Sequence, residues 1–492
     1  MNFNTKINLL RPHNPMQTLQ GSLESDRGRI INNAALRRLQ QKTQVFPLER
    51  NAAVRSRLTH SLEVQQNGRF IAQSITKELQ RRQLAPELHS ELSAALETLV
   101  EMACLMHDIG NPAFGHFGEA AINDWFKRYL SQHTTYSNNL AQLYQQEQPN
   151  LNSIENKLLF DVCHFEGNAQ AIRIVHTLCG LNLTYCQTAS ILKYTRCGTD
   201  PKPNKTQPLS YLQKKVGYYF SEQTFVHTLC DKLQITPGHR HPVSYIMEAA
   251  DDISYCLADI EDAVEKGLIS VEKLMVVLNQ EYQSQLKALP ECQQPYADFI
   301  AQKCQYAFDK ATANAANFNN EFFIWLRVSL THPLVKHATQ RFVDNLETVY
   351  HGSFNQALLE DNSYQFAITQ ALKNVAFNYV FNHKEVEQLE LQGYKITSGI
   401  LSEYQRLLDL NAKQFATVIN KSKDYPVEVR LLNRISDKFV AVYQQTVKAL
   451  SEEQQQNPIF EFYYRCRLLQ DFVSGMTDQF AYDTYRALMV TD

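Results

Sequence analysis

The chain has 492 residues, of which 44% are hydrophobic, and its net charge is −3. With only 16 glycines and 16 prolines to interrupt helices, the composition predicts an all-α globular protein with a large core. The slightly acidic balance argues against a surface built to coat duplex DNA, and the sequence has no run of about 18 apolar residues that would span a membrane.

Ten cysteines lie between Cys104 and Cys466 without a CxxC pair. The first residues, "MNFNTKINLLRPHNP", lack the charged-then-apolar pattern of a secretion signal. We therefore expect a cytoplasmic protein with reduced thiols. No long Gly-, Ser- or Pro-rich linker divides the chain, so one large unit over 1–492 with helical subdomains is expected rather than separate domains.

The first long helix is predicted from about residue 59, where apolar side chains recur at helical intervals. A second covers 92–108 and leads into "CLMHDIGNPAFGHFGEAA" at 104–121. Glycines and a proline in this stretch stop the helix and leave His107 and Asp108 in its last turn, free to reach past its end. Such residues after an apolar run are typical of a site rather than a core.

A third helix is predicted to start near Phe117. The segments 131–158 and 197–210 are polar and rich in helix breakers, so we expect long loops there. Further along, "IMEAADDISYCLADIED" predicts an apolar helix that contains Asp251.

Four side chains on these helices have the character of metal ligands: His60 at the start of the first, His107 and Asp108 at the end of the second, and Asp251. A His-Asp pair alone is more often a helix cap or a surface pair. A carboxylate in an apolar helix, however, is costly unless it is paired or binds a metal. Two imidazoles and two carboxylates form a mixed nitrogen and oxygen donor set. Such a set is typical of a site for Mn²⁺, Mg²⁺ or Fe²⁺ rather than of a Cys-rich structural zinc site, and four ligands leave positions open for water and substrate.

His116 and Glu119 lie three residues apart, so on a helix they share a face. Glu119 can then orient the imidazole as part of an acid–base pair. Alternatively, Glu119 caps the helix and His116 merely lines the loop. The residues alone leave both interpretations open.

The order H…HD…D resembles the HD superfamily of metal-dependent phosphohydrolases. Longer stretches, including "LMHDIGNPAFGHFGEAAINDWF", "CHFEGNAQAIR" and "MEAADDISYCLADIEDAVEKG", are similar to the bacterial deoxyguanosine triphosphate triphosphohydrolases, and the likeness continues nearly to the C-terminus. It implies a helical HD core at about 55–270, a C-terminal helical region at 271–492, and hydrolysis of dGTP to deoxyguanosine and inorganic triphosphate. It also implies a homohexamer. The four metal ligands predict one Mg²⁺ or Mn²⁺ per site, and single-stranded DNA bound in a basic groove is a candidate effector.

The resemblance also assigns roles residue by residue. It makes His116 and Glu119 the catalytic pair, and it places phosphate contacts at Arg57, Asn168, Lys193, Tyr194 and Lys215, sugar contacts at Tyr255 and Asp259, and base contacts at Gln44 and Glu390. Tyr255 and Asp259 share a helix face with Asp251, and a carboxylate such as Glu390 can accept from the N1 and N2 protons of guanine. For His164 we expect a structural hydrogen bond rather than a catalytic role.

Two other functions remain to be weighed. An HD-family nucleotide phosphodiesterase or nucleotidase would keep the four metal ligands but would not need Arg57, Lys193 and Lys215 together. A nucleotide-regulated protein that binds single-stranded nucleic acid would not need the pair of His116 and Glu119. Analysis of the phosphate product distinguishes the first alternative, since triphosphate from a dNTP indicates a triphosphohydrolase and orthophosphate from a monophosphate a nucleotidase. Turnover of a nucleotide would argue against the second alternative.

Overall fold

The computed structural model describes residues 1–492 except 15, 145–148, 290, 292–294 and 491–492. The described part is predominantly helical, which confirms the all-α class predicted from the sequence. Its two short strands, β1 (Arg196–Cys197) and β2 (Val216–Tyr218), pair in parallel. Among the described helices, none has the length and apolar character to span a membrane.

Three long helices form the centre of the molecule: α3 (Arg57–Arg82), α4 (Glu91–Met106) and α11 (Pro242–Glu265). Around them pack α1 (Leu19–Ile31), α9 (Tyr185–Ser190) and α15 (Phe318–Asp344), and their apolar side chains share one hydrophobic cluster. The N-terminus of α3 carries a reciprocal capping box between Ser56 and Thr59. This cap fixes where the helix begins and so places His60 in its first turn.

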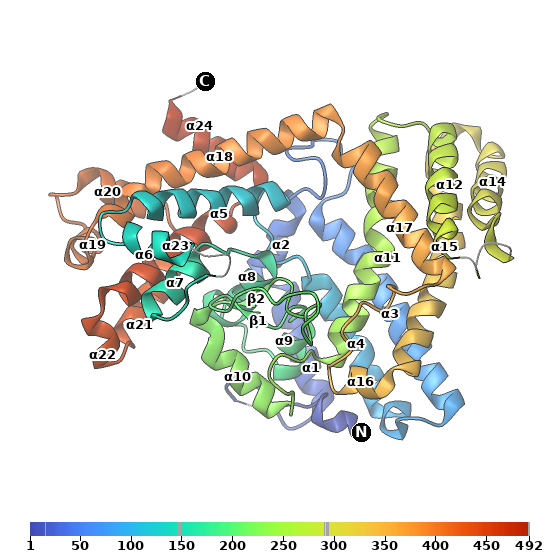
Figure 1. Cartoon of the computed structure of the whole chain (residues 1–492), viewed down its shortest axis with the longest axis horizontal. Helices are drawn as coiled ribbons and strands as arrows, with labels where there is room; N and C mark the ends of the chain where they lie inside the picture. Colours follow the sequence, from blue (N-terminus) through green and yellow to red (C-terminus); the bar gives the residue numbers. More distant parts are fainter. Residues whose placement is uncertain (15, 145–148, 290, 292–294, 491–492) are drawn as a thin grey trace.

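A second cluster lies around α5 (Gly115–Gln132), α7 (Ile154–Val162), α18 (Lys384–Asp409) and α23 (Pro458–Ser474). The long helix α18 runs along α5 (Figure 1). Arg467 of α23 pairs with Asp161 of α7 at 2.8 Å, and both side chains are completely buried. Tyr463 donates to the same carboxylate at 2.5 Å. A buried charge requires such partners, so these contacts tie α23 firmly to α7.

A third cluster combines the C-terminal half of α11 and the first half of α15 with α12 (Val271–Lys287), α14 (Phe299–Thr312) and α17 (Tyr364–Ala376). These helices lie together at one end of the molecule (Figure 1). Each of the three clusters contains residues from both sides of position 270.

The remaining elements are short or peripheral. The helices are α2 (Ala34–Arg38), α6 (Ser137–Leu143), α8 (Gly167–Arg173), α10 (Gln223–Lys232), α16 (Leu346–Tyr350), α19 (Ala412–Ile419), α20 (Pro426–Leu432), α21 (Asp437–Lys448), α22 (Glu452–Gln456) and α24 (Asp478–Met489). Single turns of 3₁₀- or π-helix are η1 (Phe3–Thr5), η2 (Leu39–Gln41), η3 (Pro86–His89), η4 (Ile174–Leu178), η5 (Phe220–Glu222), η6 (Ala315–Asn317) and η7 (Phe377–Phe381).

The loop predicted over 131–158 is wrong in part, because the segment contains α6 and the first turns of α7. Leu140, Leu143 and Leu158 are buried in the second cluster, so a few apolar side chains fix helices in a stretch that is polar overall. Residues 145–148 of this prediction lie outside the described residues. The segment 197–210 has no helix in the structure, as predicted.

Candidate active site

A pocket of about 800 Å³ lies where the turn between α4 and α5 meets α11, α17 and α18. Of the residues predicted from the sequence, all except His60 and Asp259 line it. Both exceptions are fully buried. The fold therefore gathers residues from Gln44 to Glu390 around one cavity.

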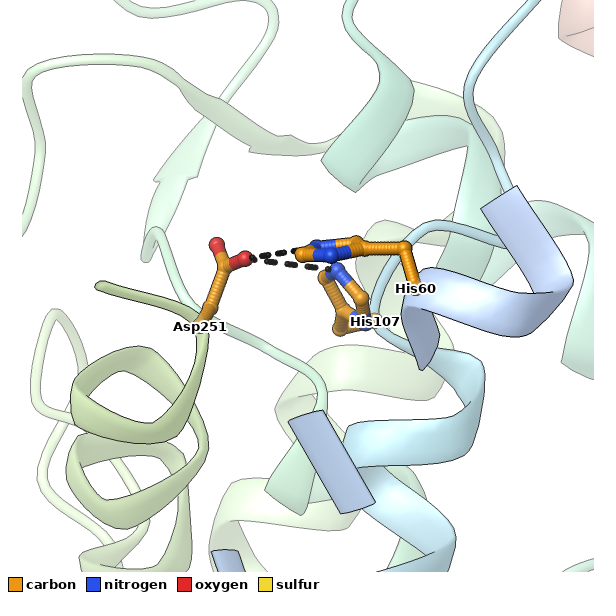
Figure 2. A group of neighbouring side chains, drawn as sticks. All are labelled: His60, His107 and Asp251. Carbon is orange, nitrogen blue, oxygen red and sulfur yellow. Dashed lines mark hydrogen bonds and ion pairs between the residues drawn. The ribbon is translucent and has the colours of Figure 1, made fainter. Parts of the chain in front are cut away.

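His60, His107 and Asp251 form a compact group at this pocket, with their ligand atoms within 4.8 Å of one another. His60 comes from the first turn of α3, His107 from the end of α4 and Asp251 from α11. Both imidazoles face the same carboxylate oxygen (Figure 2), with His60 Nε2 at 3.3 Å and His107 Nε2 at 3.6 Å from Asp251 Oδ1. Three donor atoms this close can hold a single cation.

The donor atoms of this group are also oriented for a cation. His107 donates from Nδ1 to the carbonyl of Cys104 at 2.7 Å, so the lone pair of Nε2 faces Asp251. Burial raises the pKa of Asp251. The nearby charge of His107, the hydrogen bond from His60 and the charge of Lys193 together outweigh burial and lower the pKa. An ionised carboxylate beside imidazole nitrogen atoms is a donor set that fits a divalent metal ion.

Asp108 lies beside this group rather than within it. Its Oδ2 accepts from Arg57 at 2.5 Å, and its Oδ1 accepts from the Asn111 amide at 2.6 Å and lies 3.5 Å from His107 Nε2. Burial raises the pKa of Asp108, but His107 and Arg57 outweigh it and lower the pKa to about 2. The carboxylate is thus ionised and next to the group but turned toward Arg57 and Asn111.

His116 and Glu119 meet in the first turns of α5. His116 Nδ1 lies 3.0 Å from Glu119 Oε2, while Glu119 Oε1 accepts from the backbone N–H of Gly167 at 2.8 Å. The imidazole is 80% exposed and the carboxylate 12%. Because the two oxygens of Glu119 contact His116 and Gly167, Glu119 does not cap α5. The N-cap residue of this helix, Phe114, makes no side-chain cap bond. Burial raises the pKa of Glu119, but the hydrogen bond and charge of His116 outweigh it and lower the pKa.

Positive side chains stand around the His60, His107 and Asp251 group, each next to a carboxylate. Lys193 Nζ is 3.8 Å from Asp251 Oδ2 and 3.8 Å from Glu248 Oε1. Lys215 Nζ lies 3.1 Å from Glu166 Oε1, which also accepts from the Asn168 amide at 2.8 Å. The Tyr194 ring packs near the Lys193 ammonium. The pocket thus brings cationic side chains and hydrogen-bond donors, each paired with a carboxylate, into the same cavity as the candidate metal ligands.

Two residues predicted to contact the sugar lie at different depths. Tyr255 lines the pocket, with its ring stacked on Phe381 at a centroid distance of 6.2 Å. Asp259 lies one turn further along α11, fully buried, with both oxygens lacking a hydrogen-bond partner among the described residues. Burial raises its pKa well above the usual range. The structure does not bring Asp259 to the pocket surface, so its sugar contact stays a prediction.

The residues predicted to contact the base, Gln44 and Glu390, come from opposite ends of the chain and both line the pocket. The side-chain oxygen of Gln44 is buried and has no hydrogen-bond partner among the described residues. Glu390 lies in α18, where burial and the neighbouring Glu387 raise its pKa to about 7. Both side chains therefore have acceptor oxygens available to a ligand.

The sequence-based interpretation missed several lining residues. Lys373 of α17 pairs with Asp252 at 3.3 Å, and both line the pocket with Phe377. No motif marks Lys373, because its pocket position depends on how α17 packs on α11. Glu166 lies within the quoted stretch "CHFEGNAQ" and could have been found there. His164 bonds the carbonyl of Phe160 through Nδ1 at 2.7 Å, which is the structural contact that the sequence predicts.

Comparisons with known proteins agree on one family. Residues 57–162 match the model of the HD domain. The chain is 50% identical to a Pseudomonas aeruginosa protein named "Probable deoxyguanosinetriphosphate triphosphohydrolase", over 99% of both chains. It is 47% identical to the deoxyguanosinetriphosphate triphosphohydrolase of Salmonella typhimurium, over 100% of this chain and 99% of that one.

Proposed function

The chain belongs to the deoxyguanosinetriphosphate triphosphohydrolase family of the HD superfamily, and we propose that it hydrolyses dGTP to deoxyguanosine and inorganic triphosphate in the pocket described above. The observation that carries the proposal is the convergence in one cavity of the His60, His107 and Asp251 group, the pair of His116 and Glu119, and two lysines.

We propose that His60, His107 and Asp251, together with Asp108, hold one Mg²⁺ or Mn²⁺. The fixed orientation of His107 and the two ionised carboxylates support this assignment. When bound, such an ion polarises a phosphoryl oxygen and lowers the pKa of a bound water. Of the four proposed ligands, Asp108 is the one whose oxygens are engaged elsewhere in the structure, because they accept hydrogen bonds from Arg57 and Asn111.

The chain's own residues would bind the triphosphate and move the proton. Arg57, Lys193 and Lys215 would offset the phosphate charge, and the neutral Asn168 and Tyr194 would donate hydrogen bonds to it. Together these contacts would fix the α-phosphorus in place. Water would add to that phosphorus and give up one proton, the bond to the 5′-oxygen would break, and the leaving oxygen would take up one proton, so that the protons balance. Glu119 holds Nδ1 of His116, which leaves Nε2 to carry that proton.

For the nucleoside we propose that Tyr255 packs on the deoxyribose, Asp259 accepts from its 3′-hydroxyl, and Gln44 and Glu390 contact the base. The unpartnered side-chain oxygen of Gln44, which lines the pocket, supports its role, since an unpaired buried acceptor is costly and is relieved by a ligand donor. Guanine offers two donors on its N1 and N2 edge, which a carboxylate such as Glu390 can accept.

The test is to incubate the purified protein with each of the four dNTPs and with Mn²⁺ or Mg²⁺, and to identify the phosphate product by ³¹P NMR. We expect inorganic triphosphate, released fastest from dGTP. His116→Ala is the matched control, because it should keep the bound metal but lower the rate about 10²–10⁴-fold. Orthophosphate, pyrophosphate or no product with dGTP would overturn the proposal, and orthophosphate from a monophosphate would favour a nucleotidase.

We also propose that the chain forms one unit with an HD core at 55–270 and a C-terminal region at 271–492, assembles as a homohexamer in the cytoplasm, and responds to single-stranded DNA. Hydrophobic clusters shared across position 270 support the single unit. The exposed apolar side chains of Phe377 and Leu391 at the pocket mouth support a contact between copies. Light scattering tests the hexamer, and turnover with added oligonucleotide tests the effector.

A further inference from the structure

Asp478, the first residue of α24, reaches two segments of the candidate active site although it lies close to the C-terminus. Its Oδ2 accepts from both the backbone N–H and the hydroxyl of Thr43, at 2.9 and 2.6 Å. Its Oδ1 accepts from the backbone N–H of Phe114 at 3.2 Å. The side chain is 2% exposed, so both oxygens are committed to these contacts in a water-poor environment.

Each of these two segments leads directly to a functional side chain. Thr43 precedes Gln44, and it also forms an isolated antiparallel bridge with Ser56, the N-cap of α3 that carries His60. Phe114 is the N-cap of α5 and lies two residues before His116. One carboxylate therefore joins the loop predicted to contact the base to the start of the helix that carries the proton-transfer pair.

The backbone at Phe114 needs such support. Its φ is +61°, a left-handed conformation that a bulky side chain rarely adopts. Residues of this kind persist only where their surroundings hold them. On the other side, a Cβ at Gly393 of α18 would lie 2.4 Å from Phe114 Cγ, so the ring is held against a helix that only glycine lets approach. Asp478 and Gly393 thus hold Phe114 by its backbone and by its ring.

A second contact runs between the same parts of the chain. The ammonium of Lys42, next to Thr43, donates to the carbonyl of Asn111 at 2.5 Å and to the carbonyl of Ser474 at 2.9 Å. Ser474 is the last residue of α23 and Asn111 lies in the turn after α4. Residues 474–478 therefore hold both 42–43 and 111–114.

We infer that Asp478 is a positioning residue. It fixes the loop that contains Gln44 relative to His116, so that the bound base and the proton-transfer pair keep a constant distance and orientation. This inference rests on the proposed function, since it concerns the geometry of that reaction. Asp478 need not touch the substrate. Removing its charge releases two loops that bind different parts of the same ligand, so both kcat and base discrimination should suffer.

The experiment compares Asp478→Asn with Asp483→Asn in the full-length, metal-loaded protein. Asp483 is exposed on the same helix and bonds only Gln479 among the described contacts, so it controls for a lost acid in α24. We expect Asp478→Asn to lower kcat for dGTP at least tenfold and to narrow its preference over other dNTPs, with metal content unchanged. Asp483→Asn should match the parent protein.

Hydrogen exchange gives a readout that does not depend on turnover. In Asp478→Asn, amides in 40–48 and 110–118 should exchange faster together, while those in α12 should be unaffected. Thr43→Val, which removes only the hydroxyl donor, should lower kcat less, and combined with Asp478→Asn it should add less than its separate effect. If Asp478→Asn folds poorly, Thr43→Val alone should still loosen 40–48.

The outcomes separate this inference from the proposed function. If the parent protein releases no triphosphate from dGTP, the proposed function fails, and the exchange data still report whether Asp478 couples the two segments. If the parent is active and Asp478→Asn keeps its kcat and base preference, Asp478 has no positioning role. A loss of activity that only follows loss of bound metal, or unchanged exchange of 40–48 in Thr43→Val, would equally overturn the inference.

Discussion

The contact between Glu119 and His116 allows a substitution that changes the position of one proton while keeping the shape of the site. A carboxylate can only accept, so His116 must carry its proton on Nδ1, and the lone pair lies on Nε2. In Glu119→Gln, the N–H of Gly167 still requires an acceptor at the position of Oε1. The amide oxygen therefore turns to Gly167 and the amide nitrogen faces His116.

An amide nitrogen donates, so the imidazole of the variant would have to accept at Nδ1 and carry its proton on Nε2. It can then neither take up a proton at Nε2 nor be stabilised when doubly protonated. A wrong tautomer in a well-formed catalytic site costs about 10⁴-fold, and a positioned acid or base is worth about 10²–10⁴-fold. We expect kcat for triphosphate release to fall within that range, equivalent to about 3–5 kcal/mol in the barrier.

The assay is steady-state release of triphosphate from dGTP, with metal content and thermal unfolding measured in parallel. Glu119→Gln keeps both hydrogen bonds of the side chain, so its unfolding temperature should stay close to that of the parent. Glu119→Ala leaves the Gly167 N–H unpaired and should cost about 1–3 kcal/mol of stability as well. A Glu119→Gln protein within threefold of the parent kcat would refute the role of the carboxylate in setting the tautomer.

Three further predictions concern the metal site, the sugar pocket and a buried histidine. Asp108→Ala and Asp251→Ala should each abolish stoichiometric Mn²⁺ binding, measured by elemental analysis, together with turnover; full activity in a metal-free preparation would contradict the metal site. Tyr255→Ala should raise the ratio of GTP to dGTP hydrolysis about 5- to 150-fold by removing the wall against a 2′-hydroxyl, whereas Asp259→Ala should lower kcat/KM for both; an unchanged ratio in Tyr255→Ala would make Tyr255 a core residue. Burial lowers the pKa of His241 to about 4, so the unfolded chain binds the extra proton between about pH 6.5 and 4, and stability that is fully present above 6.5 should be lost across that window by about 1.4 kcal/mol per pH unit. Urea unfolding of the parent and of His241→Asn checks this, and equal slopes would exclude His241 as the source.

The sequence predicts well those features that depend on neighbouring residues. Apolar spacing predicts α3, α4 and α11, and the breakers after Asp108 mark the turn where the site lies. His60, His107 and Asp251 meet because each occupies a defined place on one of these helices. The same local logic places His116 against Glu119 three residues on.

Features set by packing between distant segments are not visible in the sequence. Asp259 shares a helix face with Asp251 and Tyr255, but the helices that cover its turn of α11 bury it instead of exposing it to the pocket. Lys373 becomes a pocket residue only through the packing of α17 on α11. Helix α6 forms in a polar stretch because the second cluster needs two of its leucines. In each case tertiary contacts override the local pattern.

The buried pair of Asp161 and Arg467 also limits how early the protein can complete its folding during synthesis. Helix α7 leaves the ribosome long before α23, and until α23 arrives Asp161 lacks its partner Arg467 and α7 lacks part of its apolar cover. An unpaired charge cannot be buried cheaply, so α7 reaches its final packing only when translation is nearly complete. A protein truncated within the last helices would therefore expose apolar surface. Chaperones and proteases would recognise that surface, and the truncated protein would not be a partly active enzyme.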